Sequence, residues 1–136
     1  NGSAANDARV LKVLNFATRV VTGFRKYDHI SRAREDLQLL SPRHMSELRT
    51  LMTAYNAHAS GGPSELASLF VTFSDARTCE RVTRSDLRLR PPATRTTTGQ
   101  RSFSYRAVSL LNRMPVGAMA LDPRSFKRAA KSLVLT

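Results

Sequence analysis

Apolar residues recur at intervals of three and four along much of this chain, which is the spacing of one face of an α-helix. The stretch 101–115 has the clearest boundaries. Ser102 is a candidate N-cap and Pro115 cannot continue the helical hydrogen bonds, so the sequence predicts a helix between them. Arg106 and Arg113 make its polar side cationic. Its apolar side is formed by Phe103, Ala107, Leu110, Leu111 and Met114.

A second helix is predicted over about residues 7–21, ahead of Gly23, which is a natural C-terminal stop. Its apolar residues form one stripe, with Phe16 beside it. Because a stripe of this kind usually faces a core, we expect this side of the helix to be buried. The stripe consists of Val10, Val13, Leu14, Ala17, Val20 and Val21.

The next predicted helix is short and runs over about residues 32–40. Asp28 and Ser31 are its two candidate caps, because both side chains can accept a hydrogen bond from an exposed backbone amide. We expect its buried residues to be Leu37, Leu39 and Leu40.

Ser41 and Pro42 then open the most clearly amphipathic helix, since serine is a favoured cap and proline a favoured first helical residue. It continues through Ala59, and a further short helix is predicted at 63–70. The apolar residues of the longer helix are Met45, Leu48, Leu51, Met52 and Tyr55.

The last predicted helix begins at Asp122-Pro123, again a cap followed by proline. Its apolar face holds Phe126, Ala129, Ala130, Leu133 and Val134, and its polar face holds Arg124, Lys127, Arg128 and Lys131. We expect it to dock on the core with its cations outward. A basic amphipathic helix can also lie on an anionic membrane, but Phe126 would be its only aromatic anchor.

Residues 75–100 differ in composition from the rest of the chain, being rich in arginine and threonine. A short strand is predicted at about 87–90 and is halted by Pro91-Pro92. Residues 94–99 either return as a partner strand or stay mobile.

The predicted fold class is therefore mainly α, with five or six helices, a short strand or hairpin and a basic loop. Its expected divisions are a flexible or vector-derived start at 1–6, a helical part at 7–74, a basic connection at 75–100 and basic amphipathic helices at 101–136.

The formal net charge of +12 is high for 136 residues and indicates a polyanionic partner. Most of the cations are arginines, whose planar guanidinium can take a phosphate with two hydrogen bonds. Residues 1–75 hold 9 Lys and Arg against 7 Asp and Glu, whereas residues 76–136 hold 13 against 3. The expected contact surface is therefore in the second part, although a solvated surface or a disordered basic linker would also carry such charge.

Candidate phosphate ligands are the cations of this second part, beside hydroxyls and backbone amides. Contacts of this kind position RNA or DNA without reading its sequence. The predicted nucleic-acid-binding residues are Arg77, Arg81, Arg84, Arg88, Arg90, Arg95, Arg101, Arg106, Arg113, Lys127, Arg128 and Lys131.

No catalytic or metal-binding pattern is evident. Polymerase chemistry needs paired carboxylates that hold two metal ions, and the nearest string, Phe73-Ser74-Asp75-Ala76, has one. A zinc site needs clustered Cys and His, whereas Cys79 is the only cysteine. Asp28 and His29 are adjacent, but no nucleophile stands at a useful spacing. We therefore expect no enzymatic activity by itself, no cofactor and no small-molecule substrate.

Compartment is predicted from what the sequence lacks. A single cysteine cannot form an internal disulfide, which favours an intracellular protein of the nucleus or cytoplasm. No apolar run approaches the length of a membrane span, and no signal-peptide pattern occurs, so we expect no membrane partner.

Two blocks of the chain resemble one family. The run Arg101-Ser102-Phe103-Ser104-Tyr105-Arg106-Ala107 is similar to a segment in the tail that follows the reverse transcriptase domain of non-LTR (LINE-type) retrotransposon polyproteins. In that family the segment ends in Trp-Asn-x-Leu-Pro, where this chain has Leu111 and Met114 in place of tryptophan and leucine. One earlier block also matches, in the same order, through two pieces: Asn15-Phe16-Ala17 with Arg19, and Asp28-His29-Ile30.

The resemblance implies an origin in an RNA-directed DNA polymerase, in the tail after its catalytic domain. We expect a non-catalytic module that binds nucleic acid or packs within the polyprotein. One alternative is a structural tail that only packs against the upstream polymerase domain. Another is a part of an active reverse transcriptase whose catalytic aspartates lie outside this chain.

Overall fold

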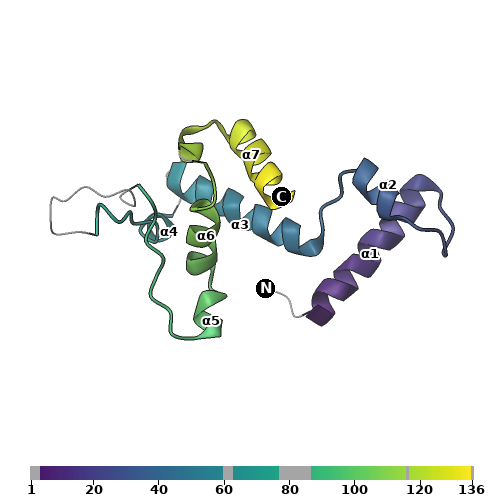
Figure 1. The fold of residues 1–136 in the computed structure, drawn as a ribbon, viewed down its shortest axis with the longest axis horizontal. Coiled ribbons are helices and arrows are strands. Elements are labelled where there is room, and N and C mark those ends of the chain that lie inside the picture. The colour runs from purple at the N-terminus through teal and green to yellow at the C-terminus, as the bar shows by residue number, and fades with distance from the viewer. Residues whose placement is uncertain (1–3, 60–62, 77–86, 116, 136) are drawn as a thin grey trace. The chain divides into compact units, whose positions relative to one another are not determined.

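The computed structural model describes residues 4–59, 63–76, 87–115 and 117–135, and within them the chain is mainly helical, as predicted (Figure 1). The elements in order are α1 (Ala4–Thr22), α2 (Ser31–Asp36), α3 (Pro42–Ala59), α4 (Ser64–Ala67), α5 (Thr97–Gln100), α6 (Phe103–Leu111), the 3₁₀-helix η1 (Ala118–Ala120) and α7 (Pro123–Leu135).

The chain divides into two compact units, Asn1–Ser46 and Glu47–Thr136. The first holds α1 and α2. The second holds most of α3 and all the elements that follow it, and it contains the hydrophobic core cluster.

In the first unit, α1 packs against α2 through a different face from the one predicted. Thr18 is the buried residue of α1, and its hydroxyl donates to the carbonyl of Leu14 at 2.8 Å, which satisfies a polar group on an inward face. The predicted stripe is mostly exposed; its outward residues are Val10, Val13, Ala17, Val20 and Val21, with Phe16 beside them. The expectation that this stripe is buried is therefore wrong for most of its members.

The second helix is shorter than predicted because a turn closes it early. Gln38 adopts φ +51°, and the Leu39 N–H donates to the Arg34 carbonyl at 2.9 Å, a pattern that terminates helices. Its N-cap is Ile30, with no side-chain hydrogen bond, so neither predicted cap serves. Asp28 instead accepts from the Arg25 N–H at 2.7 Å.

The buried residues of this part also differ in detail from the prediction. Leu40 is buried as expected, whereas Leu37 is exposed. Ile30 and Ala33 are buried instead. The helix that covers α1 thus offers only six residues, which is too few to cover the whole apolar surface of a helix of nineteen.

The core of the second unit joins α3, α6 and α7. The rings of Tyr55 and Phe126 stack with their centroids 4.2 Å apart. The Tyr55 hydroxyl donates to the Leu121 carbonyl at 2.6 Å, so the buried ring keeps a partner for its polar end. Ala107 and Val108 of α6 are fully buried in the same cluster. These contacts fix the start of α7 against the C-terminal part of α3.

Three helix starts follow the sequence closely. The Ser41 hydroxyl accepts from the His44 N–H at 3.2 Å, and the Ser102 hydroxyl accepts from the Tyr105 N–H at 3.4 Å. Asp122 caps α7 in the same way. The predicted starts of α3, α6 and α7 are confirmed because capping is local chemistry that the adjacent residues determine.

The predicted strand or hairpin at 87–90 is not present in the described residues. Leu89 makes a single antiparallel bridge with Thr72, which is an isolated pair outside any strand. Residues 97–100, in the stretch that offered a partner strand, form α5 instead, with the Thr96 hydroxyl accepting from the Gly99 N–H. Local capping thus determines a helical turn where the composition suggested an extended segment.

Candidate nucleic-acid interface

Nine of the predicted nucleic-acid-binding residues lie within the described residues, and all belong to the second unit. They are Arg88, Arg90, Arg95, Arg101, Arg106, Arg113, Lys127, Arg128 and Lys131. Arg77, Arg81 and Arg84 lie outside the described residues.

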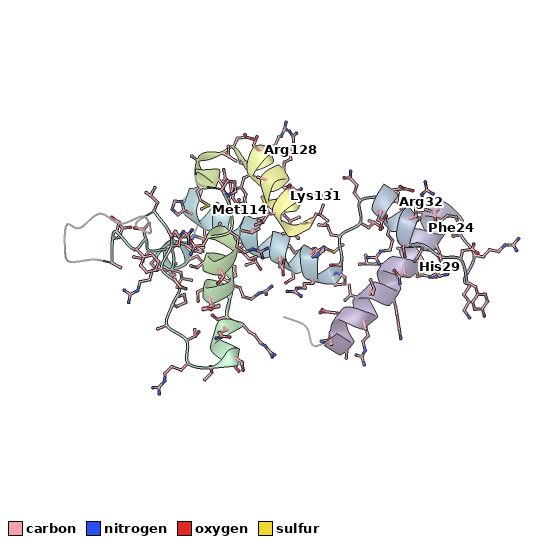
Figure 2. The ribbon with its side chains drawn as sticks, viewed as in Figure 1. Phe24, His29, Arg32, Met114, Arg128 and Lys131 are labelled. Carbon is pink, nitrogen blue, oxygen red and sulfur yellow. The ribbon has the colours of Figure 1, made fainter. Side chains whose placement is uncertain are left out.

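The most regular group of cations is on α7. Arg124, Lys127, Arg128 and Lys131 stand at relative positions 0, 3, 4 and 7, so they share one face of the helix. The first three are exposed and Lys131 is partly exposed. Arg128 and Lys131 are marked on α7 in Figure 2. We call these four residues the α7 stripe; it extends for about 10 Å along the helix axis.

The opposite face of α7 holds the stripe in place. Phe126 and Ala130 are fully buried, and Val134 is buried beside them. Burying a phenylalanine side chain contributes about 2 to 3 kcal/mol, so this anchor is strong for a small domain. The cations are consequently carried on a fixed scaffold.

The N-terminus of α7 is capped by the Asp122 carboxylate. It accepts from the backbone N–H groups of Arg124 and Ser125, each at 3.1 Å. The hydrogen bond from the Ser125 hydroxyl, followed by that from the Ser125 amide, lowers the pKa of Asp122 below its ordinary value of 3.8. Asp122 is therefore ionised at neutral pH and provides one negative charge at the start of the stripe.

The placement of these cations does not favour the helix itself. A helix macrodipole favours cations at the C-terminal end, but α7 has no basic residue in its last turn and carries Arg124, Lys127 and Arg128 in its first two turns. Mutual repulsion of like charges at i, i+4 is also unfavourable. Helix stability therefore does not explain the stripe.

A second group of cations is positioned by Asn112 at the end of α6. Its side-chain amide makes two hydrogen bonds with the backbone of Leu89: the Leu89 N–H donates to Oδ1 at 2.9 Å, and Nδ2 donates to the Leu89 carbonyl at 2.8 Å. Arg88 and Arg90, the neighbours of Leu89, are both exposed, as is Arg113, which follows Asn112.

The same segment is fixed on its other edge by residues 71–73. The Phe73 N–H donates to the Arg88 carbonyl at 3.0 Å, and the Arg90 N–H donates to the Val71 carbonyl at 2.8 Å. Arg88 and Arg90 thus extend from a backbone that is held on both sides, although it forms no strand. Sequence reasoning did not identify Asn112, because nothing in a lone asparagine after a helix specifies its partner.

The remaining predicted cations belong to neither group. Arg95 is exposed before α5, and Arg101 is exposed at its C-cap. Arg106 is partly buried and lines a shallow pocket together with Glu47, whose carboxylate is a competing anion. Arg124 was predicted on the polar face of its helix but not among the binding residues; the helical spacing is the signal that adds it.

The other chemistry considered from sequence has no site in the described part of the chain. Among those residues no group of three or more His, Cys, Asp or Glu could hold a metal ion. His29 is exposed on the loop before α2 (Figure 2). The carboxylate of its neighbour Asp28 accepts a hydrogen bond from the Arg25 backbone N–H. No helix in this part is long and apolar enough to cross a membrane.

Comparison with known proteins adds no relative: family models, curated proteins and solved structures all give no match to this chain.

Proposed function

We propose that this chain is a non-catalytic nucleic-acid-binding module that contacts the phosphate backbone of RNA or DNA. The observation that carries the proposal is the α7 stripe, four cations on one face of a helix whose other face is anchored in the core. The resemblance of the chain to the tail of a non-LTR retrotransposon reverse transcriptase supports the same function, because such a tail would work beside an RNA template and a DNA target.

The dimensions of the stripe suit a phosphate backbone. Its length of about 10 Å corresponds to the axial rise of about three nucleotides in one strand of B-form DNA. Arg88, Arg90 and Arg113 would add further phosphate contacts from a backbone held by Asn112. Contacts of this kind give affinity and orientation but no base recognition, so we propose binding with little sequence preference.

The experiment compares two triple variants that remove the same number of charges. In the test variant Arg124, Lys127 and Arg128 become Gln; in the control, Arg25, Lys26 and Arg32, three exposed cations of the first unit, become Gln. Binding to a fluorescent 20-nucleotide RNA is measured from low to physiological salt.

If the α7 stripe contacts phosphates, the slope of log affinity against log salt falls in magnitude by about 2 to 3 in the test variant. Binding then releases fewer counterions from the nucleic acid, because three phosphate contacts are lost. The control variant keeps nearly the slope of the unmodified chain. Equal losses in the two variants would contradict the proposal, since they would show that only the total charge of the chain matters.

A further inference from the structure

A further surface of this molecule is the outward side of α1, which α2 does not cover. Five of its side chains are large, apolar and more than 40% exposed: Val10, Val13, Phe16, Val20 and Val21, with exposed fractions of 46%, 67%, 68%, 66% and 72%. Phe24, labelled in Figure 2, follows the helix and is 44% exposed. Together these six side chains present on the order of 500 Å² of apolar surface, the size of patch that marks an interaction site.

The spacing of these residues specifies the kind of partner. Val10, Val13, Ala17 and Val20 of α1 are separated by three, four and three residues, which is the spacing of a coiled-coil seam. A seam of this kind packs best against another helix, since each side chain enters a hole formed by the facing helix. We call these four residues the α1 seam.

The seam is also complementary to itself. If two copies of α1 are placed antiparallel about a two-fold axis near Asn15, Val10 of one copy faces Val20 of the other, and Val13 faces the small Ala17. The same arrangement places Arg9 of each copy near the C-terminal end of the other helix, where a cation is favoured by the macrodipole. A two-fold axis requires this self-complementarity of one surface.

We propose that α1 pairs with α1 of a second copy of this chain, antiparallel, through the α1 seam. The proposal does not rest on nucleic-acid binding. Two copies would bury on the order of 1,000 Å² in total, which is at the lower limit for a specific interface. We therefore expect a dimer with a dissociation constant in the micromolar range.

Sedimentation equilibrium of the full chain between about 1 and 200 µM tests the pairing. The unmodified chain is expected to pass from monomer to dimer over this range. Val13→Glu would bury an unpaired charge in the seam and is expected to raise the dissociation constant at least about 100-fold. Because Val13 is exposed in the single chain, the variant should keep its far-ultraviolet circular dichroism.

The matched control is Leu37→Glu, which introduces the same side chain at an exposed leucine outside α1 and is expected to leave the dimer intact.

The relative direction of the two paired helices is tested by disulfide crosslinking, in a Cys79→Ser background, with Val13→Cys and Ala17→Cys proteins. Antiparallel pairing predicts that a mixture of the two forms a disulfide-linked dimer faster than either alone.

Four results would overturn the proposal: a monomer at every concentration, a dimer that Val13→Glu does not weaken, faster crosslinking of Val13→Cys with itself, or a seam that binds only another molecule. The last is examined by adding anionic vesicles or a reverse transcriptase domain to the chain. Binding to either that Val13→Glu abolishes, without any pairing of copies, would assign the seam to that partner instead.

Discussion

Asn112 provides the sharpest test of how the second unit positions its cations. Replacing it with alanine removes both hydrogen bonds to Leu89, at 2.9 and 2.8 Å, and leaves the amide and carbonyl of that residue without their partner. Each bond of this kind contributes about 1 kcal/mol net, so Asn112→Ala is expected to lower the free energy of unfolding by about 2 kcal/mol.

The effect is measured by urea denaturation followed by circular dichroism. The midpoint should fall while the m-value stays the same, since the core that unfolds is unchanged. Gln100→Ala is the control: it removes a carboxamide that is exposed on α5, and it should change the free energy of unfolding by less than about 0.5 kcal/mol.

Asn112→Asp separates the two bonds. The carboxylate can still accept from the Leu89 N–H, but it cannot donate to the Leu89 carbonyl and repels that oxygen. We expect its cost to be at least that of losing one bond, about 1 kcal/mol. If Asn112→Ala were as stable as the unmodified chain, Asn112 would not hold this segment, and the account of how Arg88 and Arg90 are positioned would be refuted.

Three further predictions concern the anchoring of α7. Tyr55→Phe keeps the stack on Phe126 but leaves the Leu121 carbonyl without its donor, so the free energy of unfolding should fall by about 1 kcal/mol in urea denaturation. Phe126→Ala empties a fully buried site and should cost about 3 to 5 kcal/mol by the same measurement. Because the pKa of Asp122 is lowered in the folded chain, its stabilising effect is present above pH 3.8 and is lost as the pH falls through the folded-state pKa; thermal melting of Asp122→Asn should therefore decline less between pH 5 and pH 2 than that of the unmodified chain.

Much of the helical architecture could be predicted because its boundaries are encoded locally. Ser41, Ser102 and Asp122 each cap the helix that follows them, and proline opens two of those helices. The helical spacing of apolar residues also predicts that Tyr55 and Phe126 lie on the inward faces of their helices. In each case a few adjacent residues contain the whole signal.

The errors arose where tertiary context decides. The apolar spacing of α1 predicts a buried stripe, but the six-residue α2 packs against the side that carries Thr18. The sequence predicts a strand around Leu89. In the structure the side-chain amide of Asn112 makes the two hydrogen bonds to Leu89 that a neighbouring strand would make. Neither outcome has a signal in the local sequence, because each depends on which element is available as a partner.

The candidate interface was partly predictable for the same reason. Helical spacing is enough to place Lys127, Arg128 and Lys131 on one face, and it adds Arg124. By contrast, no pattern indicates that Arg106 shares a pocket with Glu47. Charge composition thus indicates where the cations gather along the chain, while the structure separates the cations that are grouped from those that are not.

The measurement that tests the central claim most directly is a fluorescence-anisotropy titration of the unmodified chain. Single-stranded RNA and duplex DNA are each titrated at low salt and at about 0.15 M salt. The account predicts saturable binding to at least one of them at the higher salt. It also predicts that the logarithm of the affinity falls linearly with the logarithm of the salt concentration. Binding to both that disappears at 0.15 M salt would contradict it, because the net charge of +12 would then act only as a nonspecific attraction.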